Sequence, residues 1–426
     1  MWLPDLADPA WVRDVLSRHA GQLGLIGEVA STQLVDVRLT HPHRPESSRC
    51  RGWATYVVAL HGGSSVQLYL KGFPDRATSE AAWRQDRAAR PAGRSEHLAE
   101  DHLVVWRFPE DPRLPALPDL LASPLAPRVV PAAVGAALGP RSGLCVTVVR
   151  YQPEASATLR VEGVLAGGPT AFAKHLGAGS VEAVGARHRA LWSMTGPGQP
   201  LRVAEPLAVD PVRRVLWTRG VPGPTLTDAV PPRELAGATG PTGALLAALH
   251  GSATGPLPPT SVDGLLTEMR KKSGKLAHAH PAVEPIVSDL LAAAAKRRGD
   301  VARERVCTLH GDFHLDQLVA SADGPVLVDL DTMAHGPPEV DLAEFLVDLA
   351  LRAVPDGVAE AVADQLLSSY SAAAGTGVDA AMLAVCADAE FVNRCYRHLR
   401  RHTSGWQQDL EAELSRHRDV ARLLGR

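Results

Sequence analysis

The segment Cys307 to Val319, CTLHGDFHLDQLV, places polar side chains between two apolar stretches. Its chemically active groups are two histidines, two aspartates and a glutamine: His310, Asp312, His314, Asp316 and Gln317. Such groups can hold a metal ion, move a proton or lie solvated in a loop. Because they follow a short apolar strand, VCTLH, they lie at a strand end, where carboxylates can be presented without burying their charge.

A second apolar strand, PVLVDLD, ends in Asp329 and Asp331. Phosphoryl transfer needs few protein groups: a carboxylate near the attacking hydroxyl, oxygen ligands for Mg²⁺ and a cation on the nucleotide phosphates. Asp312 suits the first role, and Gln317 with Asp329 suits the second. Lys174 suits the third role, since it lies in the strand pattern TAFAKHL and is one of only six lysines among 44 basic residues.

Strands and helices must position these groups, and the pattern separates them along the chain. Alternating stretches at 53–60 and 66–73 flank the turn HGGSS and predict a β-hairpin. Three further alternating stretches predict an antiparallel meander at 144–151, 157–164 and 170–176. From the middle of the chain onward the periodicity is helical, interrupted by the two short strands that carry the polar loops. The pattern therefore predicts an α+β fold.

Composition also predicts how the chain divides into domains. Residues 122–142 are rich in Ala, Pro and Gly, which is typical of a boundary. We expect an N-terminal α/β cap or recognition domain at 1–140, a β-rich lobe at 141–222 and a helical lobe at 223–426. A Gly/Pro-containing hinge is expected at Trp217 to Gly223.

The two polar loops together resemble those of the aminoglycoside phosphotransferase and choline kinase group, which are relatives of protein kinases. HGDFHLDQ is similar to the catalytic loop H-G-D-x-x-x-x-N, and VDLDTMAHGPPEVDLAEFL is similar to the metal segment D-x-D followed by G-x-P and D-L-A. LAALHG, ending near His250, is similar to the helix before that loop. The resemblance covers about residues 143–426 and implies a two-lobed protein-kinase-like fold with an extra N-terminal domain.

This resemblance implies ATP and Mg²⁺ as cofactors and assigns roles to particular residues. They are the catalytic base Asp312; the nucleotide contacts Lys174, Glu182, Trp217 and Arg219; the metal ligands Gln317, Asp329 and Asp331; and the structural supports His310 and Asp341. Glu182 is expected as the acidic partner of Lys174, because it is the only carboxylate in the following helix pattern. Gln317 replaces the usual Asn, and with His314 inside the loop this is closer to maltokinase-like members, whose substrates are sugars.

The expected reaction transfers the γ-phosphoryl group of ATP to a hydroxyl of a small molecule: a sugar, an amino sugar or an aminoglycoside-like natural product. An alternative is a kinase of peptide Ser/Thr hydroxyls in peptide natural-product maturation, with the N-terminal domain recognising the peptide. A solvent-exposed groove from that domain to Asp312 would favour the peptide, and a closed acidic pocket would favour an amino sugar. Two further alternatives are an inactive kinase fold used as a binding module and a metallohydrolase built on His310, Asp312, His314, Asp329 and His335.

The overall charge and cysteine content exclude several kinds of partner. Because 44 basic residues are balanced by 47 acidic ones, we expect neither nucleic acid nor an anionic membrane as a partner. Five scattered cysteines favour neither a disulfide framework nor a thiolate zinc site. Asp5 and Asp8 lie where a signal peptide needs an apolar core, so a cytoplasmic protein is expected.

Two local runs of basic residues depart from this balance. One lies at 270–275, and the other lies in the helix pattern AEFVNRCYRHLRRH at 389–402. The ordinary explanation of each is a solvated helix face. For the second run, the alternative is a phosphorylated or acidic acceptor, bound by Arg394, Arg397, Arg400 and Arg401.

Overall fold

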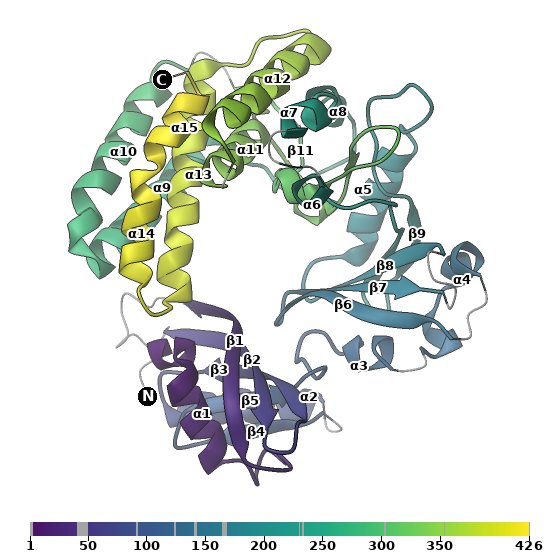
Figure 1. The fold of residues 1–426 in the computed structure, drawn as a ribbon, viewed down its shortest axis with the longest axis vertical. Coiled ribbons are helices and arrows are strands. Elements are labelled where there is room, and N and C mark those ends of the chain that lie inside the picture. Colours follow the sequence, from purple (N-terminus) through teal and green to yellow (C-terminus); the bar gives the residue numbers. More distant parts are fainter. Residues whose placement is uncertain are drawn as a thin grey trace.

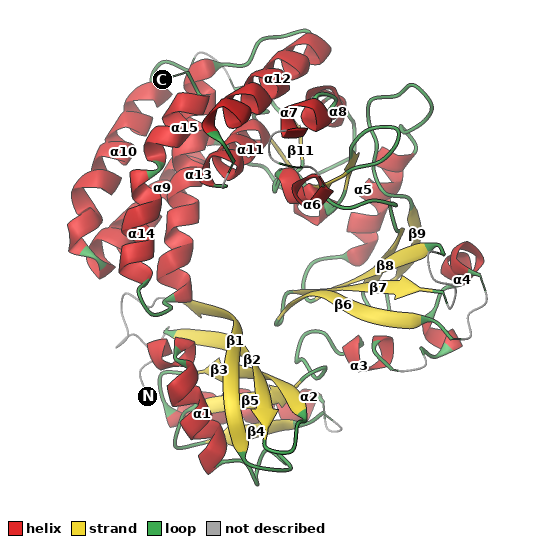
Figure 2. Cartoon of the chain, viewed as in Figure 1, coloured by secondary structure: helices red, strands yellow, loops and turns green. Residues whose placement is uncertain are grey.

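The computed structural model describes residues 3–425, apart from 41–49, 91–92, 123–124, 140–142, 164–167, 230, 232–233, 302–303 and 353. It contains two five-stranded antiparallel sheets followed by a helical lobe, which confirms the predicted α+β, two-lobed fold with an extra N-terminal domain. Figures 1 and 2 show these three parts arranged as a ring, in which the N-terminal domain lies between the second sheet and the helical lobe.

The N-terminal domain is an antiparallel sheet, in the order β1-β2-β3-β5-β4, with a helix on each face. Its elements are α1 (Pro9–Arg18), β1 (Val29–Thr40), β2 (Arg51–Leu60), β3 (Ser65–Gly72), α2 (Arg76–Ala89), β4 (Ser95–Leu98) and β5 (Leu103–Arg107). Tyr56 packs with Leu16 of α1 in one core. On the other face Tyr69 and Trp106 pack with Trp83 of α2. The predicted hairpin is confirmed as β2 and β3.

The second sheet carries Lys174 and has the order β6-β7-β8-β10-β9. Its elements are β6 (Cys145–Gln152), β7 (Ser156–Glu162), β8 (Thr170–Leu176), α5 (Val181–Trp192), β9 (Pro206–Asp210) and β10 (Val215–Arg219). The predicted meander is confirmed as β6 to β8, whereas β9 was not predicted. Successive residues of a strand face opposite sides. Leu216 therefore packs with Val184 of α5, and Trp217 packs on the opposite face.

The segment between the two sheets packs with the second one. It contains α3 (Leu117–Leu120) and α4 (Ala132–Leu138). Leu114, Leu117 and Val134 share a hydrophobic core with Leu159 and Trp217 of the second sheet. Because a domain boundary at residue 140 would cut through this core, we propose a boundary just after β5 instead.

The helical lobe surrounds two small two-stranded antiparallel sheets that frame the catalytic loop. Its α-helices are α6 (Leu226–Ala229), α7 (Leu235–Thr239), α8 (Thr242–His250), α9 (Val262–Ala279), α10 (Glu284–Arg298), α11 (Glu339–Leu351), α12 (Asp356–Ala374), α13 (Ala380–Arg401), α14 (Trp406–Ser415) and α15 (His417–Leu423). Strand β11 (Cys307–Leu309) pairs with β14 (Ala334–Gly336), and β12 (Leu318–Val319) pairs with β13 (Val326–Leu327). The catalytic loop, which runs from β11 to β12, therefore connects one small sheet to the other.

The N-terminal domain contacts each of the other two parts. Strand β1 packs against α13, and Figure 1 shows them meeting at the lower end of that helix. On the other side, Tyr69 and Lys71 of β3 donate hydrogen bonds to Glu154, in the turn between β6 and β7. The ring is therefore closed at both ends of this domain.

None of the described helices is both long enough and apolar enough to cross a membrane.

Candidate active site

The catalytic loop leaves β11 in a backbone conformation that requires glycine. Gly311 has φ +80°, and a Cβ at this position would lie 2.4 Å from the carbonyl oxygen of Thr332. The two N–H groups at the bend donate to Asp341 on the first turn of α11: His310 N to Oδ2 at 2.7 Å and Gly311 N to Oδ1 at 2.9 Å. Through these two hydrogen bonds Asp341 holds the bend of the loop, which is the structural role predicted for it.

Asp341 is fully buried and is held by a third donor group. Its Oδ2 lies 3.0 Å from Nε2 of His250, whose Nδ1 lies 2.9 Å from the hydroxyl of Tyr370. Burial alone would raise the pKa of Asp341, but its hydrogen bond to His250 and the charge of that ring lower it overall. His310 is fixed in turn, because its Nε2 lies 3.0 Å from the carbonyl oxygen of Val328.

Asp312 presents its carboxylate to the open side of this rigid loop, with 40% of the side chain exposed. Its Oδ2 lies 3.6 Å from Nε2 of His314. Burial raises its pKa, but the nearby imidazole of His314, with smaller contributions from His310 and Arg397, lowers the pKa below its ordinary value. Asp312 is therefore a carboxylate at neutral pH, which a proton acceptor must be.

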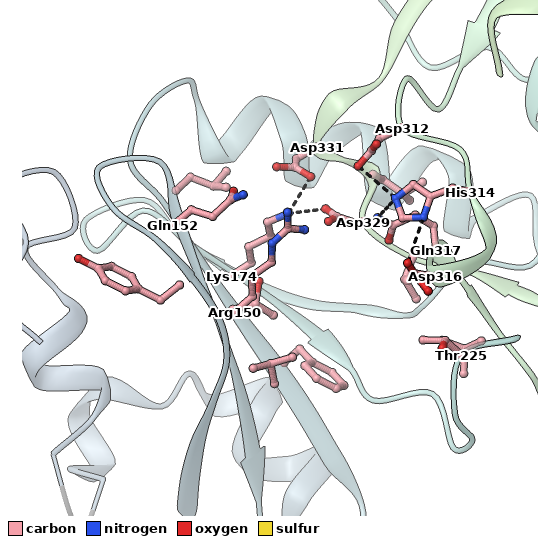
Figure 3. A pocket seen from close by; sticks show the side chains of 18 of the residues that line it. Arg150, Gln152, Lys174, Thr225, Asp312, His314, Asp316, Gln317, Asp329 and Asp331 are labelled. Carbon is pink, nitrogen blue, oxygen red and sulfur yellow. Dashed lines mark hydrogen bonds and ion pairs between the residues drawn. The ribbon is translucent and has the colours of Figure 1, made fainter. Parts of the chain in front are cut away.

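His314 occupies a central position in the loop, although no catalytic or metal-binding role in phosphoryl transfer was predicted for it from the sequence. Its Nε2 lies 3.2 Å from Nε2 of Gln317, and its Nδ1 lies 3.6 Å from Oδ2 of Asp316. Figure 3 shows the ring among Asp312, Asp316 and Gln317. The spacing of three residues between His314 and Gln317 forms one helical turn, and that spacing was the available signal. Asp316 is in turn paired with Arg352 at 2.7 Å.

Lys174 of β8 points at both aspartates of the second polar loop, as Figure 3 shows. Its Nζ donates to Oδ1 of Asp329 and, at 2.8 Å, to Oδ1 of Asp331. Burial lowers the pKa of Lys174, but the two carboxylates raise it overall. Burial and the neighbouring Asp329 raise the pKa of Asp331, because two adjacent carboxylates repel each other when both are charged. The two carboxylates, Asp329 and Asp331, therefore favour a cation between or beside them.

Two expected nucleotide contacts are wrong in this structure. Glu182 lies at the N-terminus of α5, where it accepts a hydrogen bond from Ser180 Oγ at 2.9 Å, so it is not the carboxylate that faces Lys174. Trp217 is buried in the core beneath α3 and α4. The reason is register: Leu216 pairs with Lys174 across the sheet, so Trp217 faces the other side. Arg219, by contrast, lines the cavity and pairs with Glu205 at 2.5 Å.

One continuous cavity of about 1250 Å³ joins the predicted catalytic base, metal ligands and phosphate-binding lysine. Lys174, Asp329 and Asp331 line it, and so do Asp312 and Gln317. Its wall continues onto β1 of the N-terminal domain and onto α13 of the helical lobe. A groove from the N-terminal domain to the catalytic loop is therefore present.

The histidines of the metallohydrolase alternative do not converge. Within the described part of the chain, no group of three or more His, Cys, Asp or Glu side chains is placed to hold a metal ion. His310 faces the Val328 carbonyl, and His335 lies in β14 opposite Thr308. A magnesium site needs fewer such side chains, since amide and phosphate oxygens can supply the remaining ligands.

The fold and site together define a two-lobed enzyme of the kinase-like class. The model of the phosphotransferase enzyme family matches residues 174–380. This segment runs from Lys174 to the first residue of α13 and contains both polar loops. The match confirms the resemblance predicted from the sequence and, with it, an enzyme of the phosphotransferase class. The closer relation to maltokinase-like members stays a prediction.

Among solved structures, the chain is similar to a choline/ethanolamine kinase family protein from Mesorhizobium loti, with 14% identity, a TM-score of 0.47, and 70% of this chain and 97% of that chain covered. It is similar to a choline kinase from Streptococcus pneumoniae, with 11% identity, a TM-score of 0.44, and coverages of 63% and 89%. For spectinomycin phosphotransferase in complex with ADP and spectinomycin, the identity is 11%, the TM-score 0.47, and the coverages 66% and 92%. No curated protein matches the chain in sequence.

Proposed function

We propose that the protein transfers the γ-phosphoryl group of ATP to a hydroxyl of a small molecule. The observation that carries this proposal is the convergence on one cavity of a carboxylate, Asp312, with a lysine and two aspartates, Lys174, Asp329 and Asp331. These are the groups that phosphoryl transfer needs: a proton acceptor, oxygen ligands and a cation.

In the proposed reaction the acceptor oxygen forms a bond to the γ-phosphorus, and the bond from that phosphorus to the β–γ bridging oxygen breaks. ADP leaves with the bridging oxygen, and Asp312 accepts the proton of the acceptor hydroxyl. The buried supports of the loop, His310 and Asp341, hold Asp312 in place through the hydrogen bonds at the bend. Lys174 is the proposed cation for the nucleotide phosphates, where an ammonium acts as a point charge.

Gln317, Asp329 and Asp331 are the residues proposed to hold Mg²⁺. Their donors are carboxylate and amide oxygens, which suit a hard cation. The fit is supported by the crowding of two carboxylates around the single ammonium group of Lys174. When bound, Mg²⁺ supplies charge neutralisation on the phosphates.

A sugar hydroxyl is the acceptor that we propose. An amino sugar or aminoglycoside finds less support, because arginines outnumber carboxylates by five to one among the described residues of β1 and α13 that line the cavity. A peptide Ser/Thr hydroxyl is the second candidate, and the groove that reaches from Asp312 to β1 is the observation that favours it.

A screen of ATP consumption with Mg²⁺ present tests this function. The acceptors are neutral sugars, sugar phosphates, sugar acids, aminoglycosides and Ser/Thr peptides, and the Asp312→Asn variant serves as the blank. We expect turnover with a sugar or sugar derivative that the variant lacks. ATP consumption that no acceptor stimulates would contradict the proposal, and stimulation by peptides alone would select the second candidate.

A further inference from the structure

The second half of α13 presents arginines to the cavity. Arg397, Arg400 and Arg401 all line it, and they are spaced three and four residues apart, so they share one side of the helix. Arg38 of β1, which packs against this helix, lines the same region. These four residues, Arg38, Arg397, Arg400 and Arg401, are called the arginine cluster below.

Few carboxylates neutralise the arginine cluster. Among the described cavity-lining residues of β1, α9 and α13, Asp36 is the one carboxylate. Arg397 reaches Glu390 only at 3.9 Å, and Arg38 lies over the ring of Trp53 at 5.7 Å. Arg394 differs, because it is paired with Asp348 and Glu390 at 2.7 and 2.8 Å and is therefore left out of the cluster.

Burial and mutual repulsion lower the pKa of two members of the cluster, Arg400 and Arg38. Burial and then the charge of Arg38 lower the pKa of Arg400. Burial also lowers the pKa of Arg38, which Asp36 partly offsets, and Arg401, Arg150 and Arg397 lower it further. Like charges three and four residues apart also destabilise a helix. A bound anion would relieve this repulsion, which a merely solvated helix face does not need.

The arginine cluster lies near the catalytic loop but apart from the proposed nucleotide phosphates. The charge of Arg397 contributes to the lowered pKa of Asp312, so the two groups are within electrostatic reach of each other. Figure 1 shows α13 meeting β1 on one side of the ring, whereas β8, which carries Lys174, lies on the other side. An anion at the cluster would therefore belong to the acceptor and not to ATP.

Resting on the proposed function, we infer that the acceptor is a small anionic molecule, bearing a phosphate ester or a carboxylate, which the arginine cluster binds while its hydroxyl lies at Asp312. Guanidinium groups suit this role, because their planar donors bind carboxylate and phosphate oxygens in pairs. The N-terminal domain then completes the acceptor site, since it supplies Arg38.

The first experiment measures anion binding without an acceptor. Inorganic phosphate is titrated calorimetrically into the full-length protein at saturating Mg²⁺ and a non-hydrolysable ATP analogue, so that the nucleotide site is occupied. We expect millimolar or tighter binding that Arg400→Ala and Arg401→Ala each weaken at least roughly tenfold, the scale of one charge-assisted contact. Arg270→Ala, a matched change on the exposed face of α9, should leave it unchanged. Phosphate that does not bind, or that binds the cluster variants equally, overturns the inference.

The second experiment identifies the source of the anion by turnover. Glucose, glucose 6-phosphate, glucuronate and glucosamine are compared as acceptors, together with the acceptor found in the screen. We expect the turned-over acceptor to be anionic, with KM raised at least roughly tenfold in Arg400→Ala and with rising salt, while kcat changes little. A neutral or cationic acceptor with unchanged KM overturns the inference but leaves the phosphotransferase proposal intact. Phosphate binding at the cluster without turnover of any hydroxyl compound would instead refute the proposed function, and preference for acidic peptides would refute a small-molecule acceptor.

Discussion

Lys71 of the N-terminal sheet donates a hydrogen bond to Glu154 at 2.6 Å and so connects that domain to the turn between β6 and β7. The backbone N–H of Glu154 donates to Asp111 at 2.9 Å, which fixes the turn from the other side. Lys71 and Lys174 both lie near the end of an alternating strand. The structure places them in different sheets with different carboxylate partners.

This separation predicts different effects of the two lysines on nucleotide binding. Lys174→Ala should weaken ATP binding by roughly 10- to 100-fold, the scale of a lost contact between charged groups, while the circular dichroism spectrum stays native. Lys71→Ala should change it by less than about fivefold, because partly exposed ion pairs contribute little. Calorimetric titration of both variants with ATP measures the order. The reverse order would refute the assignment of the nucleotide lobe.

Asp312→Asn should lower turnover by roughly 100-fold or more, the scale of losing a positioned base. The amide has nearly the same shape as the carboxylate but cannot accept the proton. Steady-state kinetics with the acceptor from the screen measures the effect, and the melting temperature should stay that of the wild type. Asp323→Asn, at an exposed position of the same lobe, is the matched control. A fully active Asp312→Asn protein would exclude Asp312 as the base.

Activity should require Mg²⁺ or Mn²⁺ and should survive removal of zinc, because the proposed ligands are oxygen donors. Gln317→Ala should raise the Mg²⁺ concentration for half-maximal activity by roughly tenfold or more, the scale at which groups supporting a metal site act. Titrating the metal at saturating ATP measures this shift, with exposed Gln408→Ala as the control. Stoichiometric zinc in an active preparation would support the hydrolase alternative instead.

Asp341→Ala should lower the free energy of unfolding by about 3–5 kcal/mol, because three donor groups, His310 N, Gly311 N and His250, would lose a buried charged acceptor. Urea denaturation measures the loss. Asp341→Asn, which keeps the size, provides a second variant if the first does not fold. Exposed Asp364→Ala on α12 should change stability by less than about 0.5 kcal/mol. Equal effects of the two alanine variants would contradict the supporting role.

Stability should fall in mild acid because of His175. Burial lowers the pKa of this histidine from 6.5 to about 4, and its Nε2 accepts a hydrogen bond from Ala116 N at 3.3 Å. A lowered pKa means that the unfolded chain binds the proton first, so stability present above pH 6.5 is lost as the pH falls toward 4.

The loss of folding free energy caused by His175 should be at most about 3–4 kcal/mol between pH 6.5 and 4. Denaturant unfolding at several pH values measures it. His175→Gln, which keeps an acceptor for Ala116, should flatten the decline, whereas His61→Gln at an exposed turn should not. A decline of the same steepness in both variants would assign the acid sensitivity to other groups.

Much of the fold and the site could be predicted from the sequence because the relevant signals are local. Alternation of apolar residues defines β2, β3 and the meander, and the spacing from His310 to Gln317 defines the loop. Gly311 is also a local signal, because the bend of the loop admits only a residue without a Cβ. Because the polar groups of the loop directly follow the short strand β11, the sequence alone places them at a strand end.

Tertiary structure alone decided which groups meet across space. The partner of Lys174 could not be predicted, because Asp329 and Asp331 lie more than 150 residues further along the chain. The face of Trp217 depends on the register of β10 against β8, and a shift of one residue would reverse it. The arginine cluster exists only because β1 packs against α13, which brings Arg38 beside Arg400. When two segments far apart in the sequence pack together, neither segment carries a periodic pattern that predicts the contact. Such a contact is therefore seen only in the folded chain.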